Sequence, residues 1–127
     1  WFDAPVVRYS CLINGVDTLV ITKLDVLDHL AEINVCTGYR LDGRPLEFFP
    51  TSIEVLEKVE PVYETHPGWL RDTSGVRSFE DLPEQAKSYI KRLSELVETE
   101  ISVISTGPDR EETLVIDPSP EFSRLFY

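Results

Sequence analysis

Apolar residues recur at three- and four-residue steps in two long stretches of the chain, and this spacing predicts two amphipathic helices. The stronger repeat contains Phe79, Leu82, Ala86, Tyr89, Ile90, Leu93, Leu96 and Val97. It predicts a helix over 81–98, with Ser78 and Asp81 as a capping box and Pro83 in the first turn. The second repeat predicts a helix over 4–14 that stops at Asn14-Gly15. A shorter helix is predicted over 52–59, capped by Thr51 or Ser52.

Short β-branched runs predict the strands. TLVIT (18–22) and ISVIS (101–105) have the composition of fully buried strands, and each is followed by a polar loop. A helical turn is expected over 26–33 and a strand over 33–41. Asp42-Gly43 predicts a turn there and PLEFF an antiparallel return, so that 33–49 forms a hairpin. An extended segment over 61–69 and a last strand over 112–117 complete an α/β, or mixed α+β, fold. Ligands bind beyond the carboxyl ends of strands in open α/β sheets, so the loops after TLVIT and ISVIS are the candidate site.

Charge and composition narrow the function. The 127 residues include 12 Lys and Arg against 23 Asp and Glu, a net charge of −11, which disfavours a general nucleic-acid binder but not one nucleotide in a local pocket. Cys11 and Cys36 lie in apolar stretches without CxxC spacing, so we expect buried, reduced thiols. No apolar run approaches the roughly 20 residues that span a bilayer, so no membrane is expected. The chain has no Met and opens Trp1-Phe2-Asp3, from which we expect a piece of a longer or processed chain.

The tetrapeptide TKLD, residues 22–25, has side chains suited to reading guanine. A carboxylate accepts in parallel from the ring N–H and the exocyclic amino group of guanine, whereas adenine offers a bare acceptor at the matching ring position. In an extended chain Lys23 would point to the same side as Asp25, and its alkyl stem would pack along the base. The alternative is an ordinary polar strand end, and for so short a motif taken alone it is the more common case.

The segment STGPD, residues 105–109, is the second candidate loop. Gly107 permits a close backbone approach, and consecutive N–H groups around it could donate to a carbonyl oxygen such as guanine O6. Alone, an ordinary strand-ending turn explains it better. Two such loops after two buried-type strands support a base-binding site more than either loop does.

The sequence does not support a phosphate loop, a zinc site or a catalytic triad. The sequence has no GxxxxGK[ST] or GxGxxG phosphate loop, and His29 and His66 lack the neighbours of a zinc site or a catalytic triad. Five acidic residues near the loops read as solvated surface, namely Asp28, Glu32, Asp109, Glu111 and Glu112. We therefore expect no catalytic and no metal-binding residue here. If the chain binds a nucleotide, it holds the base.

Four segments together resemble the C-terminal portion of adenylosuccinate synthetases. They are WFD…INGVDTLVITKLDVLD, VYETHPGW, LPEQAKSYIKRLSEL and ISVISTGPDREET, and the resemblance covers residues 1–117 in order. TKLDVLD and STGPDR are the most specific. On these positions the resemblance implies that Lys23, Leu24, Asp25, Ser105, Thr106 and Gly107 bind the guanine of GTP. Residues 118–127 lie beyond this resemblance, and we expect them to form a separate C-terminal tail.

The resemblance also implies an activity. The family joins IMP to L-aspartate at the expense of GTP, giving adenylosuccinate, GDP and phosphate in AMP biosynthesis. It is a cytoplasmic, homodimeric ligase with Mg²⁺ bridging the phosphates. The aspartate base, histidine acid, phosphate loop, IMP site and arginine-rich loop belong to the family's N-terminal part, which also binds the Mg²⁺. We therefore expect the 127-residue chain alone to be inactive. Two positions depart from the family: Asp17 stands where Thr or Ser is usual, and His66 stands where Leu is common.

Two other functions remain open at this stage. One is the distal half of a regulatory GTPase, in which an [NT]KxD loop also reads guanine. That class expects an Ala-containing closing loop soon afterwards, whereas the second loop here follows about eighty residues later. The other is a non-catalytic interaction domain in which KxD is accidental.

Overall fold

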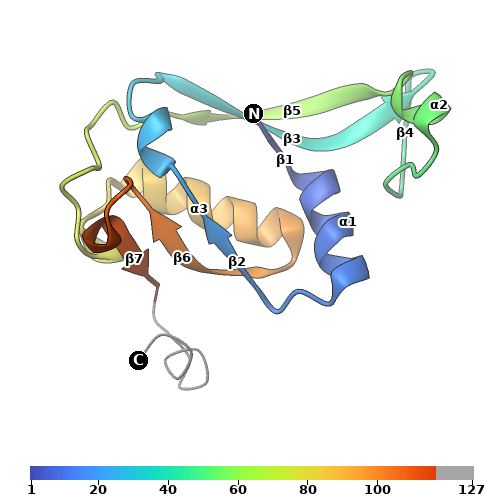
Figure 1. The fold of residues 1–127 in the computed structure, drawn as a ribbon. Coiled ribbons are helices and arrows are strands. Elements are labelled where there is room, and N and C mark those ends of the chain that lie inside the picture. The colour runs from blue at the N-terminus through green and yellow to red at the C-terminus, as the bar shows by residue number, and fades with distance from the viewer. Residues whose placement is uncertain (117–127) are drawn as a thin grey trace.

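The computed structural model describes residues 1–116, which form two β-sheets and three α-helices (Figure 1). The first sheet contains β1 (Phe2–Asp3), β3 (Glu32–Leu41), β4 (Arg44–Pro45) and β5 (Glu60–Pro67). The second contains β2 (Thr18–Ile21), β6 (Glu100–Ser105) and β7 (Thr113–Val115) in the order β2-β6-β7. The mixed α/β class predicted from the sequence is confirmed.

Helix α3 (Glu84–Val97) supplies much of the hydrophobic core. Its buried residues follow the predicted three- and four-residue steps: Ala86, Tyr89, Ile90, Leu93 and Val97. They pack with Ile33 and Val35 of β3 and with Ile101 and Ile104 of β6, so that α3 contributes to a core shared by both sheets. In Figure 1 the helix runs behind β2 and β6, below the long β3–β5 ribbon.

Helix α1 (Ala4–Asn14) forms over the predicted residues. Asp3 caps its start by accepting a hydrogen bond from the Val6 N–H at 3.3 Å, and Pro5 lies in the first turn, where no N–H is required. Gly15 ends the helix in the left-handed conformation, with φ of 61°. The predicted start and stop are both confirmed.

Strands β2 and β6 pair in parallel, with Thr18 opposite Glu100 and Ile21 opposite Ile104. Their carboxyl ends therefore lie at one edge of the sheet, as predicted. The expectation that TLVIT is fully buried is wrong. β2 pairs only with β6 among residues 1–116, and Val20 on this edge strand is 52% exposed.

The predicted hairpin is only partly formed. Asp42 and Gly43 make the turn with positive φ values of 51° and 76°, but the return strand contains only Arg44–Pro45. The segment then leaves the sheet, because Phe49 stacks on Tyr9 of α1 with ring centroids 4.9 Å apart. The long antiparallel partner of β3 is β5, with Glu32 opposite Pro67 and Arg40 opposite Glu60.

Helices α2 and α3 and strand β7 are shorter than predicted. α2 spans Ile53–Leu56, and Ser52 stands at its N-cap without a side-chain capping bond because its hydroxyl donates to Glu54. α3 starts after Pro83, since 3₁₀ helix η2 (Phe79–Asp81) precedes it as a separate turn. There the Ser78 hydroxyl bonds the Asp81 carboxylate rather than a backbone N–H. β7 ends at Val115, while Asp117 and the predicted 118–127 tail lie outside the described residues.

Both cysteines are buried and free, as predicted. Burial raises the pKa of the Cys36 thiol, and the Cys36 thiol donates a hydrogen bond to the Gly38 carbonyl at 3.3 Å. None of the helices within residues 1–116 is long and apolar enough to cross a membrane.

Candidate functional site

Asp25 lies in a tight turn directly after β2. The turn is 3₁₀ helix η1 (Leu24–Leu27), and Lys23 precedes it in the left-handed conformation with φ of 59°. Leu24 is only 1% exposed and anchors the turn in the core. The predicted extended geometry, with Lys23 and Asp25 on one side of the chain, is therefore wrong, because the backbone reverses at Lys23. The predicted helical turn begins two residues earlier, at Leu24, and ends before β3.

The carboxylate of Asp25 has an unusual environment. Its Oδ1 atom is buried and has no hydrogen-bond partner within residues 1–116. A buried carboxylate oxygen without a donor costs free energy, and such atoms are rare in folded proteins. Oδ1 is shielded from solvent, so the side chain must turn outward before a ligand can donate to it. The Asp25 carboxylate thus has an acceptor atom without a donor, and in this conformation a ligand in solvent cannot reach that atom.

The second loop is held by bonds to η3 (Arg110–Glu112). Thr106 is fully buried, and both its N–H and its hydroxyl donate to the Glu112 carbonyl, at 2.9 and 3.2 Å. The Ser105 hydroxyl donates to the Gly107 carbonyl at 2.7 Å. The prediction of consecutive free N–H groups is therefore wrong, since the Thr106 N–H is already used and Pro108 has none.

Gly107 makes the close approach that its sequence position suggested, but to a side chain of its own loop. A Cβ added there would lie 2.1 Å from a carboxylate oxygen of Glu112. That carboxylate accepts from the Asp109 N–H at 3.0 Å, and Asp109 caps η3 in return. The prediction that Asp109 and Glu112 are only solvated surface is therefore wrong. The two residues form a capping box that shapes the loop.

The two candidate loops lie close together. Both follow strands that end at the same sheet edge, and η1 contacts β6 directly. A carboxylate that lacks a partner and a glycine-containing loop can together read a flat base with N–H groups on one edge and a carbonyl on the other. The structure thus brings Asp25 near Ser105, Thr106 and Gly107 at one edge of the sheet.

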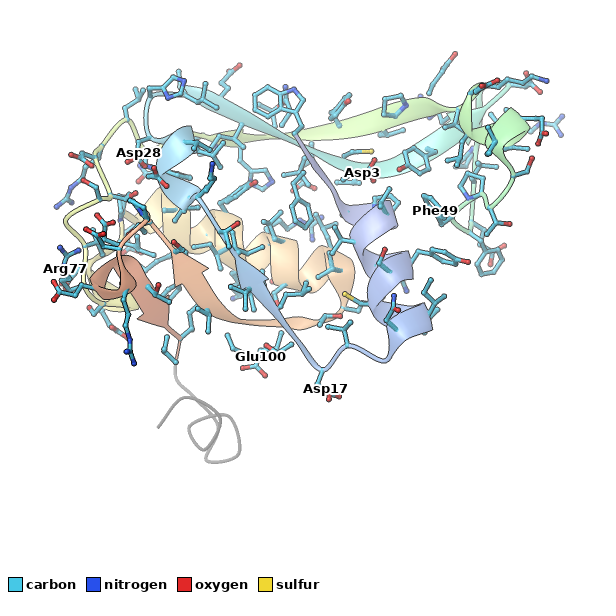
Figure 2. The ribbon with its side chains drawn as sticks, in the orientation of Figure 1. Asp3, Asp17, Asp28, Phe49, Arg77 and Glu100 are labelled. Carbon is cyan, nitrogen blue, oxygen red and sulfur yellow. The ribbon has the colours of Figure 1, made fainter. Side chains whose placement is uncertain are left out.

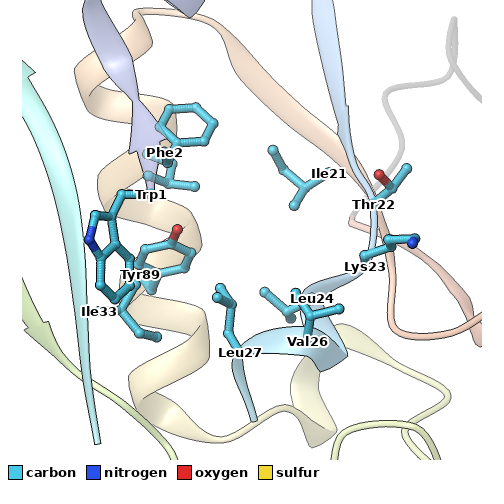
Figure 3. Close-up of a pocket in the computed structure, with 11 residues that line it drawn as sticks. Trp1, Phe2, Ile21, Thr22, Lys23, Leu24, Val26, Leu27, Ile33 and Tyr89 are labelled. Atoms are coloured by element: carbon cyan, nitrogen blue, oxygen red, sulfur yellow. The ribbon is translucent and has the colours of Figure 1, made fainter. Parts of the chain in front are cut away.

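A cavity of about 250 Å³ opens beside Lys23 (Figure 3). Apolar side chains line most of it, among them Trp1, Phe2, Leu27 and Leu93. Burial raises the pKa of Tyr89, on the same wall, to about 12. Asp25 and the second loop do not line this cavity, and in Figure 3 the Lys23 ammonium group points away from Trp1. The cavity therefore includes Lys23 and Leu24 but not the other four residues predicted to bind the base.

The sequence predicts that Asp28 is solvated surface, but the structure gives it buried hydrogen-bond partners. It follows η1 and accepts hydrogen bonds from Trp69 and Thr73, so the surface interpretation is wrong. Figure 2 shows it at the turn after β2, next to the loop that joins β5 to α3. No spacing in the sequence indicates these partners, because they follow more than forty residues later.

The other polar residues among 1–116 do not form a second candidate site for a metal ion. Within the described part of the chain, no group of three or more His, Cys, Asp or Glu side chains is arranged to hold a metal ion. The Nε2 atom of His66 lies 2.7 Å from a carboxylate oxygen of Glu64, and no third metal-ligating side chain joins this pair within residues 1–116. The arrangement after β2 and β6 is the strongest candidate for function.

A family model described as adenylosuccinate synthetase matches residues 1–114. The chain belongs to the adenylosuccinate synthetase family. An adenylosuccinate synthetase from Geobacter sulfurreducens is 53% identical over 116 residues, which make up 91% of this chain and 27% of that protein. The chloroplastic adenylosuccinate synthetase 1 of Ricinus communis is 49% identical over 116 residues, 26% of its length.

A solved structure shows the same fold. The fully ligated adenylosuccinate synthetase from Plasmodium falciparum superposes with a TM-score of 0.87 at 39% identity, over 92% of this chain and 28% of that one. The chain therefore spans about a quarter of the length of the adenylosuccinate synthetases it matches.

Proposed function

We propose that residues 1–117 are the C-terminal, guanine-binding portion of an adenylosuccinate synthetase. The whole enzyme would ligate IMP and L-aspartate with GTP, giving adenylosuccinate, GDP and phosphate for AMP biosynthesis. In this assignment Lys23, Leu24 and Asp25 form one guanine-binding segment, and Ser105, Thr106 and Gly107 form the other. Residues 118–127 would be a separate tail.

The observation that carries the proposal is the unpartnered Oδ1 atom of Asp25 after β2. Guanine supplies two parallel N–H donors that would satisfy a carboxylate in this position, whereas adenine would leave it unpaired. The Gly107 N–H finds no partner among residues 1–116, so it is the group we assign to guanine O6. We keep Lys23 in the guanine-binding segment because it directly precedes η1, and its alkyl stem would pack along the base.

The other steps of the reaction are assigned to the part of the synthetase that this chain does not include. That part would hold the phosphates with Mg²⁺, bind IMP and L-aspartate, and carry the catalytic residues. Mg²⁺ would neutralise charge on the transferred phosphate. The homodimeric, cytoplasmic state is proposed from the family, although the Ricinus communis relative is named as chloroplastic.

Calorimetry with the full-length protein tests the base assignment. Asp25→Asn replaces one acceptor with a donor, so we expect GDP affinity to fall about 10- to 100-fold, the worth of a bidentate base contact. ADP affinity should change little. Asp17→Asn is the matched control, because Asp17 is exposed and makes no hydrogen bond or ion pair within residues 1–116. Unchanged GDP affinity in Asp25→Asn would show that Asp25 does not read guanine.

The same titration, together with an assay of ligase turnover, separates the alternative functions. A non-catalytic interaction domain would bind neither GDP nor ADP. A regulatory GTPase would bind GDP but would not ligate IMP and aspartate. Ligase turnover by the 127-residue chain alone would overturn the assignment of catalysis to the rest of the enzyme.

A further inference from the structure

The carboxylate of Asp28 ties the turn that carries Asp25 to a distant loop. Its Oδ1 accepts from the Trp69 indole N–H at 2.5 Å, and its Oδ2 accepts from the Thr73 backbone N–H at 2.7 Å. The Thr73 hydroxyl lies 3.0 and 3.1 Å from the two oxygens and donates to this carboxylate. Three donors from one loop therefore converge on one side chain.

These bonds are formed away from solvent. Thr73 is fully buried and Trp69 is 7% exposed, so both donors would be costly to leave unpaired. Hydrogen bonds to an ionised carboxylate are about twice as strong as neutral ones. No ion pair involves Asp28 within the described residues, so hydrogen bonds from uncharged donors alone hold its carboxyl group.

The backbone of the same loop is also fixed against this region. The Gly68 N–H donates to the Ala31 carbonyl at 2.8 Å, and a Cβ on Gly68 would lie 1.8 Å from the Leu30 carbonyl oxygen. The Trp69 ring packs near Tyr89 of α3 with centroids 6.0 Å apart. The 68–73 loop is thus a rigid support seated on the segment that follows η1.

Asp28 is linked to Asp25 through the backbone as well. Its N–H donates to the Asp25 carbonyl at 3.1 Å, closing η1. Leu24 anchors the start of this four-residue helix in the core, and Asp28 anchors its end to the 68–73 loop. With both ends held, the Asp25 Cα–Cβ bond has a fixed direction, as base reading requires.

We propose that Asp28 is a positioning residue for guanine recognition, which fixes the direction of Asp25 by holding η1 to Trp69 and Thr73. The inference rests on the proposed guanine-binding function. Asp28 itself touches no nucleotide. Its loss should misalign the Asp25 carboxylate and so weaken the contact that distinguishes guanine from bases without an exocyclic amino group.

Affinity for two diphosphates in full-length variants tests the proposal. GDP carries the exocyclic amino group and inosine 5′-diphosphate lacks it, and saturating IMP keeps the second compound out of the IMP site. In Asp28→Asn we expect GDP affinity to fall roughly tenfold and inosine diphosphate affinity to fall less, because only guanine uses both carboxylate oxygens. Thr73→Val should lower the ratio of GDP affinity to inosine diphosphate affinity as well, but by a smaller factor. Thr73→Ser, which keeps the hydroxyl, should behave as the wild type.

The outcomes separate the two proposals. If Asp25→Asn lowers the preference for GDP over inosine diphosphate but Asp28→Asn and Thr73→Val do not, the positioning role of Asp28 is wrong and guanine recognition stands. If Asp25→Asn leaves that preference unchanged, the proposed function itself fails. Thermal unfolding of each variant identifies any that is misfolded. Should Asp28→Asn not fold, Thr73→Val alone decides, since it retains the Thr73 N–H bond.

Discussion

Gly68 lies so close to the segment before β3 that no side chain fits there. The nearest atom to an added Cβ is the backbone carbonyl oxygen of Leu30, at 1.8 Å, and a backbone atom cannot move aside as a flexible side chain can. We expect Gly68→Ala to lower the free energy of unfolding by about 3 kcal/mol, as overpacking in a tight site does. Chemical denaturation measures it.

Gly75→Ala is the matched control for this substitution. Gly75 has open space around an added Cβ and no positive φ, so its replacement should leave stability nearly unchanged. Equal unfolding midpoints for the two variants would mean that the loop 68–73 is not seated on Leu30 and Ala31 as described.

Gly107 is restricted by a side chain rather than by backbone. Gly107→Ala would push the Glu112 carboxylate off the Asp109 N–H, which costs about 1 kcal/mol, the usual worth of a cap. Glu112→Ala should cost a similar amount, and the double variant should cost less than the sum, because the collision is then absent. Strict additivity of the unfolding free energies would contradict this account.

Asp25 and Asp28 show what residue type alone leaves undecided. Both are aspartates in one short polar stretch, yet one has an unpartnered oxygen and the other accepts from two distant residues. The chemistry of Asp25 could be argued from the sequence because a carboxylate matches guanine wherever it is held. The role of Asp28 could not, because its partners come from another loop.

At the scale of elements, an ion pair joins β5 to α3. Both oxygens of Glu64 accept from the Arg92 guanidinium, each at 2.9 Å, and Arg92 also reaches Glu95. The Arg92 hydrogen bonds hold the pKa of the Glu64 carboxyl below its ordinary value, with a smaller contribution from His66, while partial burial opposes them. The pair therefore contributes stability at neutral pH.

The sign of this pKa shift predicts how stability depends on pH. Because the folded pKa of Glu64 is lowered, its contribution is fully present above the unfolded pKa of about 4.3 and is lost as the pH falls through the folded pKa. Arg92→Met should lower the unfolding temperature at pH 7, and its difference from the wild type should shrink in acid. Lys91→Met, an exposed neighbour without an ion pair in residues 1–116, is the control. A difference that stays constant from pH 7 to pH 3 would contradict the prediction.

The elements predicted best are those whose signals are local. The repeat of α3, the Pro5 and Gly15 limits of α1 and the Asp42-Gly43 turn depend on neighbours in the chain, and all three form. The return strand was overpredicted because Phe49 packs on Tyr9, a contact that no local pattern encodes.

At the scale of the whole molecule, residues 1–116 present an edge strand and several exposed apolar side chains. β2 is paired on one side only within residues 1–116, and Val20 on it is half exposed. Open strand edges favour association between chains, and a lysine there opposes it. We expect the isolated 127-residue chain to self-associate and Val20→Lys to reduce this in sedimentation experiments.

Ile53→Lys is a control for the nature of that association. Ile53 is 70% exposed, but it lies in α2 and not on a strand edge. If its replacement reduces association as much as Val20→Lys does, general apolar contact and not strand pairing is responsible.

The sequence by itself determined the α/β class, the two short apolar strands with their adjoining loops and the candidate carboxylate, because periodicity, turn residues and functional-group chemistry are local properties. Only the tertiary structure decided that the chain reverses at Lys23, that the Thr106 N–H is already used, and that Asp28 binds Trp69 and Thr73. These features arise where segments distant in sequence meet, and their hydrogen bonds depend on packing that no short stretch specifies.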